Sequence, residues 1–167
     1  DALPISRRPQ AAIILDCSSP DRIGTVAEQI SGLPTAVIDH HVPGEPFGQV
    51  QYIDPETRAT TILVHRLLHS LNIRETAEEA TLLFLGLATD TGFFRFLEES
   101  DAQAFLDAGS LVALGASPKQ AYGQINGRRS FNSRQLLARM LGRAEHIADG
   151  RAIITYQTRG DTAQFGP

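Results

Sequence analysis

Two adjacent histidines stand directly after a carboxylate at the end of an apolar stretch of the sequence. In "TAVIDHHVPGEPFG", His40 and His41 follow Asp39, and a loop rich in Pro and Gly comes next. Carboxylates that end apolar runs recur as Asp16 in "AAIILD" and Asp90 in "LGLATDTGFF". Carboxylates and imidazoles suit manganese and related divalent ions, and a neighbouring carboxylate can orient a metal-binding histidine. The pattern therefore predicts a metal centre built from these residues.

Each of these residues also has an ordinary structural explanation. An aspartate at the end of a strand, such as Asp16, is more often a turn or capping residue. Asp90 alone would be a helix-end residue, and an isolated histidine pair is usually explained by surface position or core packing. The joint pattern favours the metal centre, because all three positions follow apolar runs and parallel strands would deliver their ends to one edge of a sheet.

Short apolar runs alternate with helical patterns along the first half of the chain. Strands are predicted at 11–16, 35–39 and 49–54. Helices are predicted at 18–31, 55–72, 76–92, 100–115, 117–126 and 130–147. A last strand is predicted at 151–158, and no regular element is expected at 159–167. This order predicts an α/β domain with a mostly parallel sheet flanked by helices, followed by a helical region.

The composition limits the partners and the cellular location that we expect. The chain has 167 residues and a net charge of −4, so it has no broad basic surface for nucleic acid and any such contact would be local. The single cysteine, Cys17, excludes an intramolecular disulfide and fits a reducing cytoplasm. No apolar run is long enough to span a bilayer, and there is no secretory signal pattern. We expect a cytoplasmic protein without a membrane partner, and a homodimer stays open.

Three stretches of the sequence resemble motifs of a known enzyme family. "LDCSSPDRIG", "IDHHVPGEPFG" and "ATDTGFFRF" resemble, in this order, the second, third and fourth motifs of the DHH phosphoesterases, which are named for Asp-His-His. Within that family the motifs are most similar to the NrnA-type branch of nanoRNases (oligoribonucleases) and pAp phosphatases. The match runs from about residue 11 to the end of the chain.

The resemblance implies a role for each residue of the metal centre. Asp16 would bridge two manganese ions, with magnesium or cobalt as alternatives, and His40 and Asp90 would bind the second ion. His41 would face the scissile phosphate, while Asp39 would orient the histidine pair from behind. Water activated by the two ions would then hydrolyse phosphodiester or phosphomonoester bonds of short oligonucleotides or nucleoside bisphosphates.

The sequence also departs from the family pattern. The family's first motif, similar to His-x-x-x-Asp-x-Asp, is absent before Asp16, and so is the C-terminal DHH-associated domain. We therefore expect residues 1–149 to form a DHH domain that is incomplete at its N-terminus, and residues 150–167 to be a linker or the first strand of the associated domain. Three ligands cannot saturate two ions, so we expect this fragment to bind metal weakly and to show little or no activity.

Two further residues are candidates for substrate contact. Arg95 follows the fourth motif closely, and a planar guanidinium matches the oxygens of a phosphate. A structural ion pair is the alternative for Arg95. Thr60 stands near the start of a predicted helix, where backbone N–H groups can hold an anion. Capping of that helix is the alternative for Thr60.

Other polar residues are better explained by structure. His65 and His69 have a spacing that can bind zinc, but the glutamate of a His-Glu-x-x-His motif is absent. Arginines on or near the last predicted helix could follow a nucleic-acid backbone, although a solvated helix face is the usual explanation; they are Arg128, Arg129, Arg134, Arg139 and Arg143.

Two alternatives to the nuclease and phosphatase function remain at the level of sequence. One changes only the substrate, giving a cyclic-dinucleotide phosphodiesterase or an exopolyphosphatase of the same family. The other is a catalytically inactive DHH-like binding or scaffold module, which the absent first motif favours. The intact Asp16, His40 and Asp90 favour catalysis, because clustered carboxylates and imidazoles are costly to retain without a function.

Overall fold

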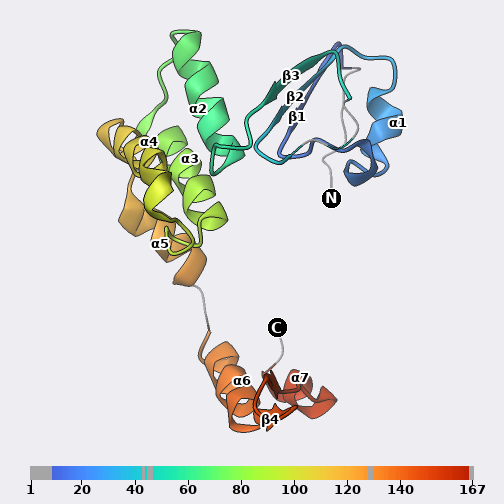
Figure 1. Ribbon diagram of the computed structural model, residues 1–167, viewed down its shortest axis with the longest axis vertical. Coiled ribbons are helices and arrows are strands. Elements are labelled where there is room, and N and C mark those ends of the chain that lie inside the picture. The colour runs from blue at the N-terminus through green and yellow to red at the C-terminus, as the bar shows by residue number, and fades with distance from the viewer. Residues whose placement is uncertain (1–8, 43, 45–46, 128–129, 166–167) are drawn as a thin grey trace. The chain divides into compact units, whose positions relative to one another are not determined.

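The structure is a computed structural model that describes residues 9–42, 44, 47–127 and 130–165 (Figure 1). It consists of two compact units, Asp1–Ala121 and Tyr122–Pro167, which are described separately. This division differs from the boundary predicted near Asp149 and Gly150, which falls in a hairpin turn of the second unit. The assignment of the domains stays a prediction.

The first unit contains a three-stranded parallel sheet, which confirms the predicted fold class. Its strands are β1 (Ala12–Leu15), β2 (Thr35–Asp39) and β3 (Val50–Ile53), and β2 lies between the other two. Leu15 of β1 pairs with Ile38 of β2, and Asp39 pairs with Ile53 of β3. The carboxyl ends of all three strands therefore lie at the same edge of the sheet, as the sequence pattern requires.

The connection between β1 and β2 is less regular than predicted. In place of one helix over 18–31 there is a single 3₁₀ turn, η1 (Pro20–Arg22), and a short helix, α1 (Val26–Ile30). The prediction was wrong because Gly24 lies between them with a φ of +55°, a left-handed conformation that interrupts the helical hydrogen bonds. Pro20 does begin the first turn, as the Ser-Pro pattern indicated.

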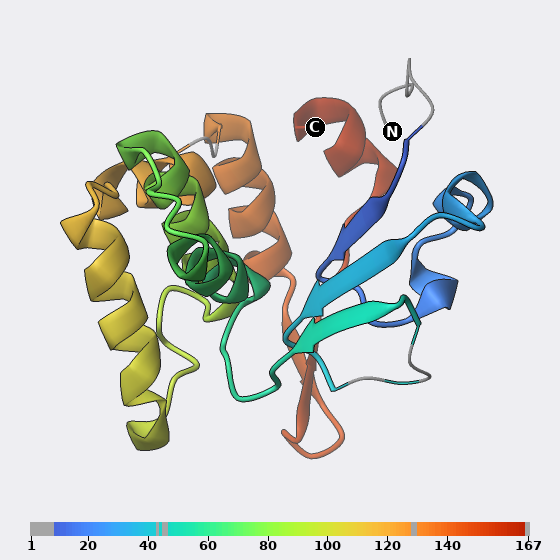
Figure 2. The same cartoon turned by 90° about the horizontal axis from the view of Figure 1, so that it is seen from above.

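Three helices pack into a bundle beside the carboxyl edge of the sheet. They are α2 (Thr60–Ser70), α3 (Ala77–Asp90) and α4 (Ala102–Ala113), with a 3₁₀ turn, η2 (Glu99–Asp101), before α4. Figure 2 shows the arrows of β1, β2 and β3 pointing towards this bundle. Its core is apolar and fully buried at Ile62, Leu87 and Leu111. The bundle provides the rigid support against which the strand ends are held.

The helix α3 is fixed at its start by a capping box. The Thr76 hydroxyl accepts from the Glu79 N–H at 3.2 Å, while the Glu79 carboxylate accepts from the Thr76 N–H at 2.8 Å. This reciprocal pair satisfies backbone donors that the helix itself leaves unpaired, and such caps contribute about 1 kcal/mol. Because the start of α3 is fixed in this way, its length determines where its last residue, Asp90, is placed.

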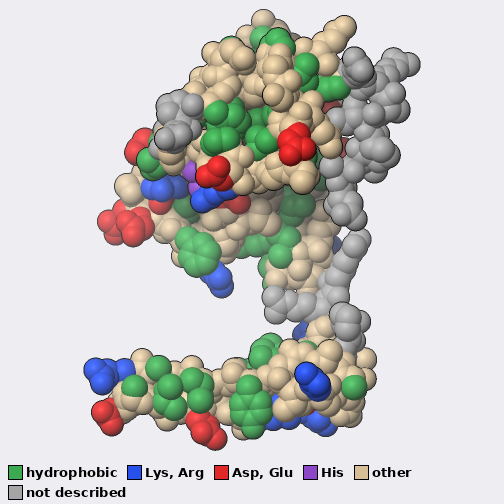
Figure 3. All heavy atoms as spheres, turned by 90° about the vertical axis from the view of Figure 1, so that its right-hand side faces the viewer, with side chains coloured by type: hydrophobic (Ala, Val, Ile, Leu, Met, Phe, Trp, Pro, Cys, Tyr) green, Lys and Arg blue, Asp and Glu red, His purple; other side chains and the backbone are tan. Residues whose placement is uncertain are grey.

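The second unit is small, and α5 (Pro118–Asn126) leads into it across the boundary. It holds α6 (Phe131–Gly142), an antiparallel hairpin of β4 (Glu145–Ile147) and β5 (Ala152–Ile154), and α7 (Arg159–Phe165). Figure 3 shows hydrophobic side chains on the surface of this part. Leu141 and Ile153 are about two-thirds exposed. Among the described helices, none is long and apolar enough to cross a bilayer.

Two predictions for this unit were wrong. The helix expected over 130–147 ends at Gly142, because residues 145–147 pair with β5 instead of continuing the helix. The stretch 159–167 was expected to lack a regular element, but α7 begins there. A capping signal was present in the sequence: the Thr158 hydroxyl and the Asp161 carboxylate bond each other's backbone N–H groups.

Candidate metal centre

Asp16 follows β1 in a left-handed conformation, with a φ of 61°. Aspartate tolerates this conformation better than most residues. The Asp16 N–H continues the parallel ladder by donating to the Ile38 carbonyl at 3.0 Å. Its Oδ1 accepts a hydrogen bond from the Thr60 hydroxyl at 2.7 Å. The aspartate is therefore held from two sides, by the sheet through its backbone and by the first residue of α2 through its carboxylate.

His40 is the residue that links the carboxylates of the site. Its Nδ1 lies 3.2 Å from the carbonyl oxygen of Thr57. Its Nε2 lies 3.6 Å from Asp16 Oδ1 and 3.7 Å from Asp90 Oδ2. Both distances exceed a hydrogen bond, but two ligand atoms that each bind one ion at about 2.1 Å lie about 3 to 4 Å apart. His40 is thus spaced from Asp16 and from Asp90 as two ligands of a shared divalent ion would be.

Asp90 reaches this site from the C-terminal end of α3. Burial raises the pKa of its carboxyl group; the nearby His40 opposes that rise and the Asp16 carboxylate adds to it. The charged form of Asp90 thus lacks a full compensating charge among the described side chains, which a bound cation would supply. After Asp90 the chain turns through Gly92, Phe93 and Phe94, all with positive φ. A Cβ on Gly92 would clash with the Phe96 ring, so glycine is required for this turn.

Asp39 and His41 form a pair beside the three ligands. Asp39 is fully buried, and its Oδ1 accepts from both the backbone N–H and the Nδ1 of His41, at 3.0 and 2.7 Å. Burial acts to raise the pKa of Asp39, but the hydrogen bonds from His41 outweigh it, so the pKa lies below its ordinary value. Because Nδ1 is engaged in this way, the half-exposed ring of His41 can offer only its Nε2 to a ligand.

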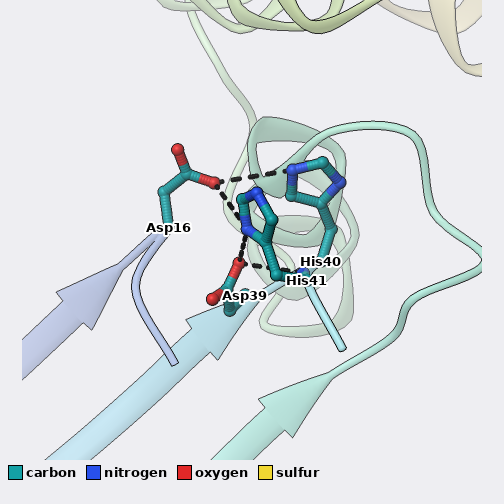
Figure 4. Close-up of side chains that lie close together, drawn as sticks. All are labelled: Asp16, Asp39, His40 and His41. Carbon is teal, nitrogen blue, oxygen red and sulfur yellow. Dashed lines mark hydrogen bonds and ion pairs between the residues drawn. The ribbon is translucent and has the colours of Figure 1, made fainter. Parts of the chain in front are cut away.

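Figure 4 shows the side chains of Asp16, His40 and His41 converging from two neighbouring strand ends, with Asp39 behind them. One potential ligand atom of each of these four residues lies within 4.8 Å of the others. The oxygen and imidazole donors fit a divalent ion such as manganese or zinc better than a soft metal. The structure therefore brings four of the five predicted residues into one cluster and places the fifth, Asp90, 3.7 Å from His40, while their individual roles stay predictions.

The two residues predicted to contact substrate differ in their surroundings. Thr60 does not cap α2, so that alternative was wrong: Ala59 is the capping residue, and the Thr60 hydroxyl bonds Asp16 instead. Arg95 is exposed, and its guanidinium carbon lies 4.5 Å from the centroid of the Phe96 ring. A contact of either residue with substrate stays a prediction.

The other polar residues are explained mainly by structural contacts. His65 is held by Glu75, with Nδ1 2.5 Å from its carboxylate, and Ser110 lies 3.3 Å from Nε2. Over the described ranges, the only potential metal cluster of at least three residues is the one around Asp16. Arg139 and Arg143 both pair with Asp161, whereas Arg128 and Arg129 lie outside the described residues.

Sequence reasoning missed the contribution of Thr57. It is its backbone carbonyl, not its side chain, that contacts His40. Every residue carries such a carbonyl, so no residue type could have marked this position in advance. The hydroxyl contact from Thr60 to Asp16 was also missed, because 44 residues separate the partners.

Comparison with known proteins relates the chain to phosphoesterases, although no family model matches it. It is 37% identical over 95 residues to the bifunctional oligoribonuclease and PAP phosphatase NrnA of Thermus thermophilus, which covers 56% of this chain and 28% of that protein. It is 38% identical over 90 residues to the A-adding tRNA nucleotidyltransferase of Geobacter sulfurreducens, covering 50% of this chain and 10% of that protein.

A solved structure shares the fold. An exopolyphosphatase-related protein of Bacteroides fragilis superposes with a TM-score of 0.79 at 21% identity, covering 93% of this chain and 47% of that one. The chain thus spans about half, or less, of the length of the proteins it matches. The similarity to NrnA and the shared fold confirm the resemblance to the DHH-type phosphoesterases that the three motifs indicated.

Proposed function

We propose that this chain is the metal-binding part of a manganese-dependent phosphoesterase that hydrolyses short oligonucleotides or nucleoside bisphosphates. The observation that carries the proposal is the position of His40, whose Nε2 faces carboxylate oxygens of Asp16 and Asp90 at 3.6 and 3.7 Å. These atoms would hold one divalent ion. Such an ion lowers the pKa of a water that it binds and neutralises charge on phosphate oxygens.

Asp16 is the residue best placed to serve two ions. Its Oδ1 lies 3.6 Å from His40 Nε2, and its side chain is more than half exposed. Its second oxygen is therefore available to a second ion. Among the described residues, no second cluster of potential ligands would complete the coordination of that ion. This argument supports the bridging role expected from the family resemblance.

His41 would act on the substrate directly, and Asp39 would act on it indirectly, through His41. The buried Asp39 accepts the Nδ1–H of His41 and so fixes the ring with Nε2 outward. A protonated His41 could donate from Nε2 to a phosphate oxygen or to the departing oxygen of the broken bond. Asp39 would stabilise that protonated form through the same hydrogen bond.

The substrate class rests on similarity and on charge. The relative NrnA is named as a bifunctional oligoribonuclease and PAP phosphatase, and the proposed substrates follow that name. The net charge of −4 in this chain argues against a long nucleic-acid track. Arg95 and Thr60 are the candidates for local phosphate contact near the site.

The substrate test uses the protein as its gene encodes it, assayed with manganese on the dinucleotide pApA, on pAp, on a cyclic dinucleotide and on polyphosphate. We expect release of mononucleotide or phosphate from the first two. An Asp16→Asn variant should lose nearly all of this activity, whereas a His69→Asn variant, which changes an exposed histidine outside the site, should keep it. Equal activity in the two variants would refute the proposed centre, and turnover of polyphosphate alone would refute the proposed substrate.

The metal test uses the 167-residue chain itself in a calorimetric titration with manganese. Three side-chain ligands leave even one ion with several water ligands, so we expect weak binding. Two tight sites in this chain would contradict the proposed ligand set.

A further inference from the structure

We propose that Arg66 is a positioning residue for the metal centre and acts on His40 through Thr57. The proposal rests on the function proposed above, in which His40 is a metal ligand. Arg66 lies on α2 and makes none of the contacts found among Asp16, His40 and Asp90. Hydrogen bonds to Thr57 nevertheless join its guanidinium to the imidazole, and they form three links: His40 to Thr57, Thr57 to Asp54, and Arg66 to Thr57.

The first link fixes which nitrogen of His40 carries the proton. A carbonyl oxygen can only accept, so the 3.2 Å contact with the Thr57 carbonyl requires a proton on His40 Nδ1. In the neutral ring the lone pair is then on Nε2, the atom that faces Asp16 and Asp90. The Thr57 carbonyl thus selects the tautomer that can bind a metal at this position.

The second link holds Thr57 in place. This residue is buried, and it lies in the loop between β3 and α2. Its hydroxyl donates to Asp54 Oδ2 at 2.7 Å, and its backbone N–H donates to the Asp54 carbonyl at 3.2 Å. Asp54 Oδ1 in turn accepts from the Glu56 N–H at 3.1 Å. The loop is therefore ordered by the carboxylate and carbonyl of Asp54, and the Thr57 hydroxyl is the group through which an outside residue can reach it.

The third link is Arg66 itself. Its Nη1 donates to the Thr57 hydroxyl at 2.8 Å and lies 3.5 Å from Asp54 Oδ2, while its Nη2 donates to Asp107 Oδ2 on α4 at 3.0 Å. One planar group thus ties the loop that carries the Thr57 carbonyl to the helical bundle. Without it, Thr57 and Asp54 lose their hydrogen-bonded connection to Asp107 of α4, and the carbonyl loses one of the supports that aim it at His40.

The surroundings of Arg66 supply a way to test this idea. Its guanidinium lines a cavity of about 560 Å³ together with Asp54, Thr57, Arg58 and Asp107, among others. An Arg66→Ala variant would leave a space open to solvent in which a free guanidinium ion can meet the same oxygens. Arg58 provides the matched control, because it lines the same cavity but pairs with Asp101 instead of Thr57.

The experiment reads the NMR shifts of the two His40 ring nitrogens in the metal-free chain at a mildly alkaline pH. In the unaltered protein we expect a protonated Nδ1 and an unprotonated Nε2. Arg66→Ala should give a mixture of tautomers and a manganese affinity about tenfold lower, the size of effect typical for residues that support a metal ligand. Millimolar guanidinium should restore both properties in Arg66→Ala, and Arg58→Ala should match the unaltered protein throughout.

A second variant protects the test against a folding failure. Thr57→Val keeps the backbone carbonyl but removes the hydroxyl that Arg66 and Asp54 share, so it should also mix the tautomers. Unchanged His40 shifts in both Arg66→Ala and Thr57→Val would overturn the proposal, as would an equal response to guanidinium in Arg58→Ala. A His40→Ala variant that still binds manganese normally would instead refute the proposed metal centre, while the tautomer result would stand by itself.

Discussion

Two clusters of charged side chains, one around Asp161 and one around His40, contain carboxyl groups whose pKa values are shifted in opposite directions. In the second unit, Asp161 accepts two hydrogen bonds from Arg143, at 2.5 and 3.0 Å, and further bonds from Thr158. These contacts hold the pKa of Asp161 far below its ordinary value. In the first unit, burial raises the pKa of Asp90, and the imidazole of His40 lies 3.7 Å from its carboxylate.

The difference separates a structural cluster from the candidate metal centre. Around Asp161 each negative charge already has a positive partner, so nothing remains for a ligand to add. Around His40 two carboxylates share one imidazole at distances too long for hydrogen bonds. Such a site gains from a cation, because the ion supplies the missing charge and the missing contacts together. A cluster that is short of positive charge is therefore the better candidate for metal binding.

The largest effect should come from removing a carboxylate from each cluster in turn. Asp16→Asn should weaken manganese binding by about a hundredfold or more, because losing a ligand costs more than losing a supporting residue. Asp161→Asn should leave the manganese affinity unchanged, since Asp161 is fully engaged by Arg143, Arg139 and Thr158. Calorimetric titration of both variants makes the comparison. A loss of manganese binding in Asp161→Asn would break the distinction between the two clusters.

The sequence predicted the strand-borne part of the site better than the elements around it. Asp16, Asp39 and the two histidines could be placed because parallel strands deliver their carboxyl ends to one edge, whatever connects them. The connection itself could not be placed, because Gly24 adopts a left-handed conformation that a helical pattern of apolar residues does not reveal.

The contacts that support the predicted ligands also could not be predicted from the sequence. The Thr60 hydroxyl and the Thr57 carbonyl meet Asp16 and His40 only after α2 has packed next to β2. Local propensity carries no information on such pairs, since they depend on the tertiary arrangement. In the same way, the helical pattern of the sequence continues beyond Gly142, but residues 145–147 pair with β5 and form the strand β4 instead.

A smaller effect should distinguish a supporting residue from a ligand within the metal centre. Thr60→Val removes the hydroxyl that donates to Asp16 Oδ1 at 2.7 Å and keeps the shape of the side chain. We expect about a tenfold loss of manganese affinity, less than for Asp16→Asn, because the carboxylate itself remains. The same calorimetric titration measures it, and an affinity equal to that of the unaltered chain would show that Asp16 needs no support from α2.

The Asp161 cluster predicts a pH dependence of stability with a definite sign. The folded pKa of Asp161 lies below the unfolded value of 3.8, so the folded state favours the charged carboxylate. Its contribution is fully present above about pH 4 and is lost as the pH falls towards the lower, folded pKa. Urea unfolding followed through this range should show a smaller loss in Asp161→Asn, which lacks the titrating group. Parallel curves for both proteins would contradict the pairing with Arg143.

The smallest effect should come from Thr61, the neighbour of Thr60 on α2. Its hydroxyl is buried without a hydrogen-bond partner among the described residues, and its methyl group lies against Gly86 of α3. Thr61→Val keeps the methyl contact and removes an unpaired polar atom, so the variant should be as stable as the parent or more stable by up to about 1 kcal/mol. Its manganese affinity should not change. The two adjacent threonines would then respond differently to the same substitution, because only the Thr60 hydroxyl donates a hydrogen bond to Asp16, a predicted metal ligand. Urea denaturation and manganese titration of the Thr61→Val chain check both halves, and a loss of affinity as large as that of Thr60→Val would mean that the packing of α2, not one hydrogen bond, supports Asp16.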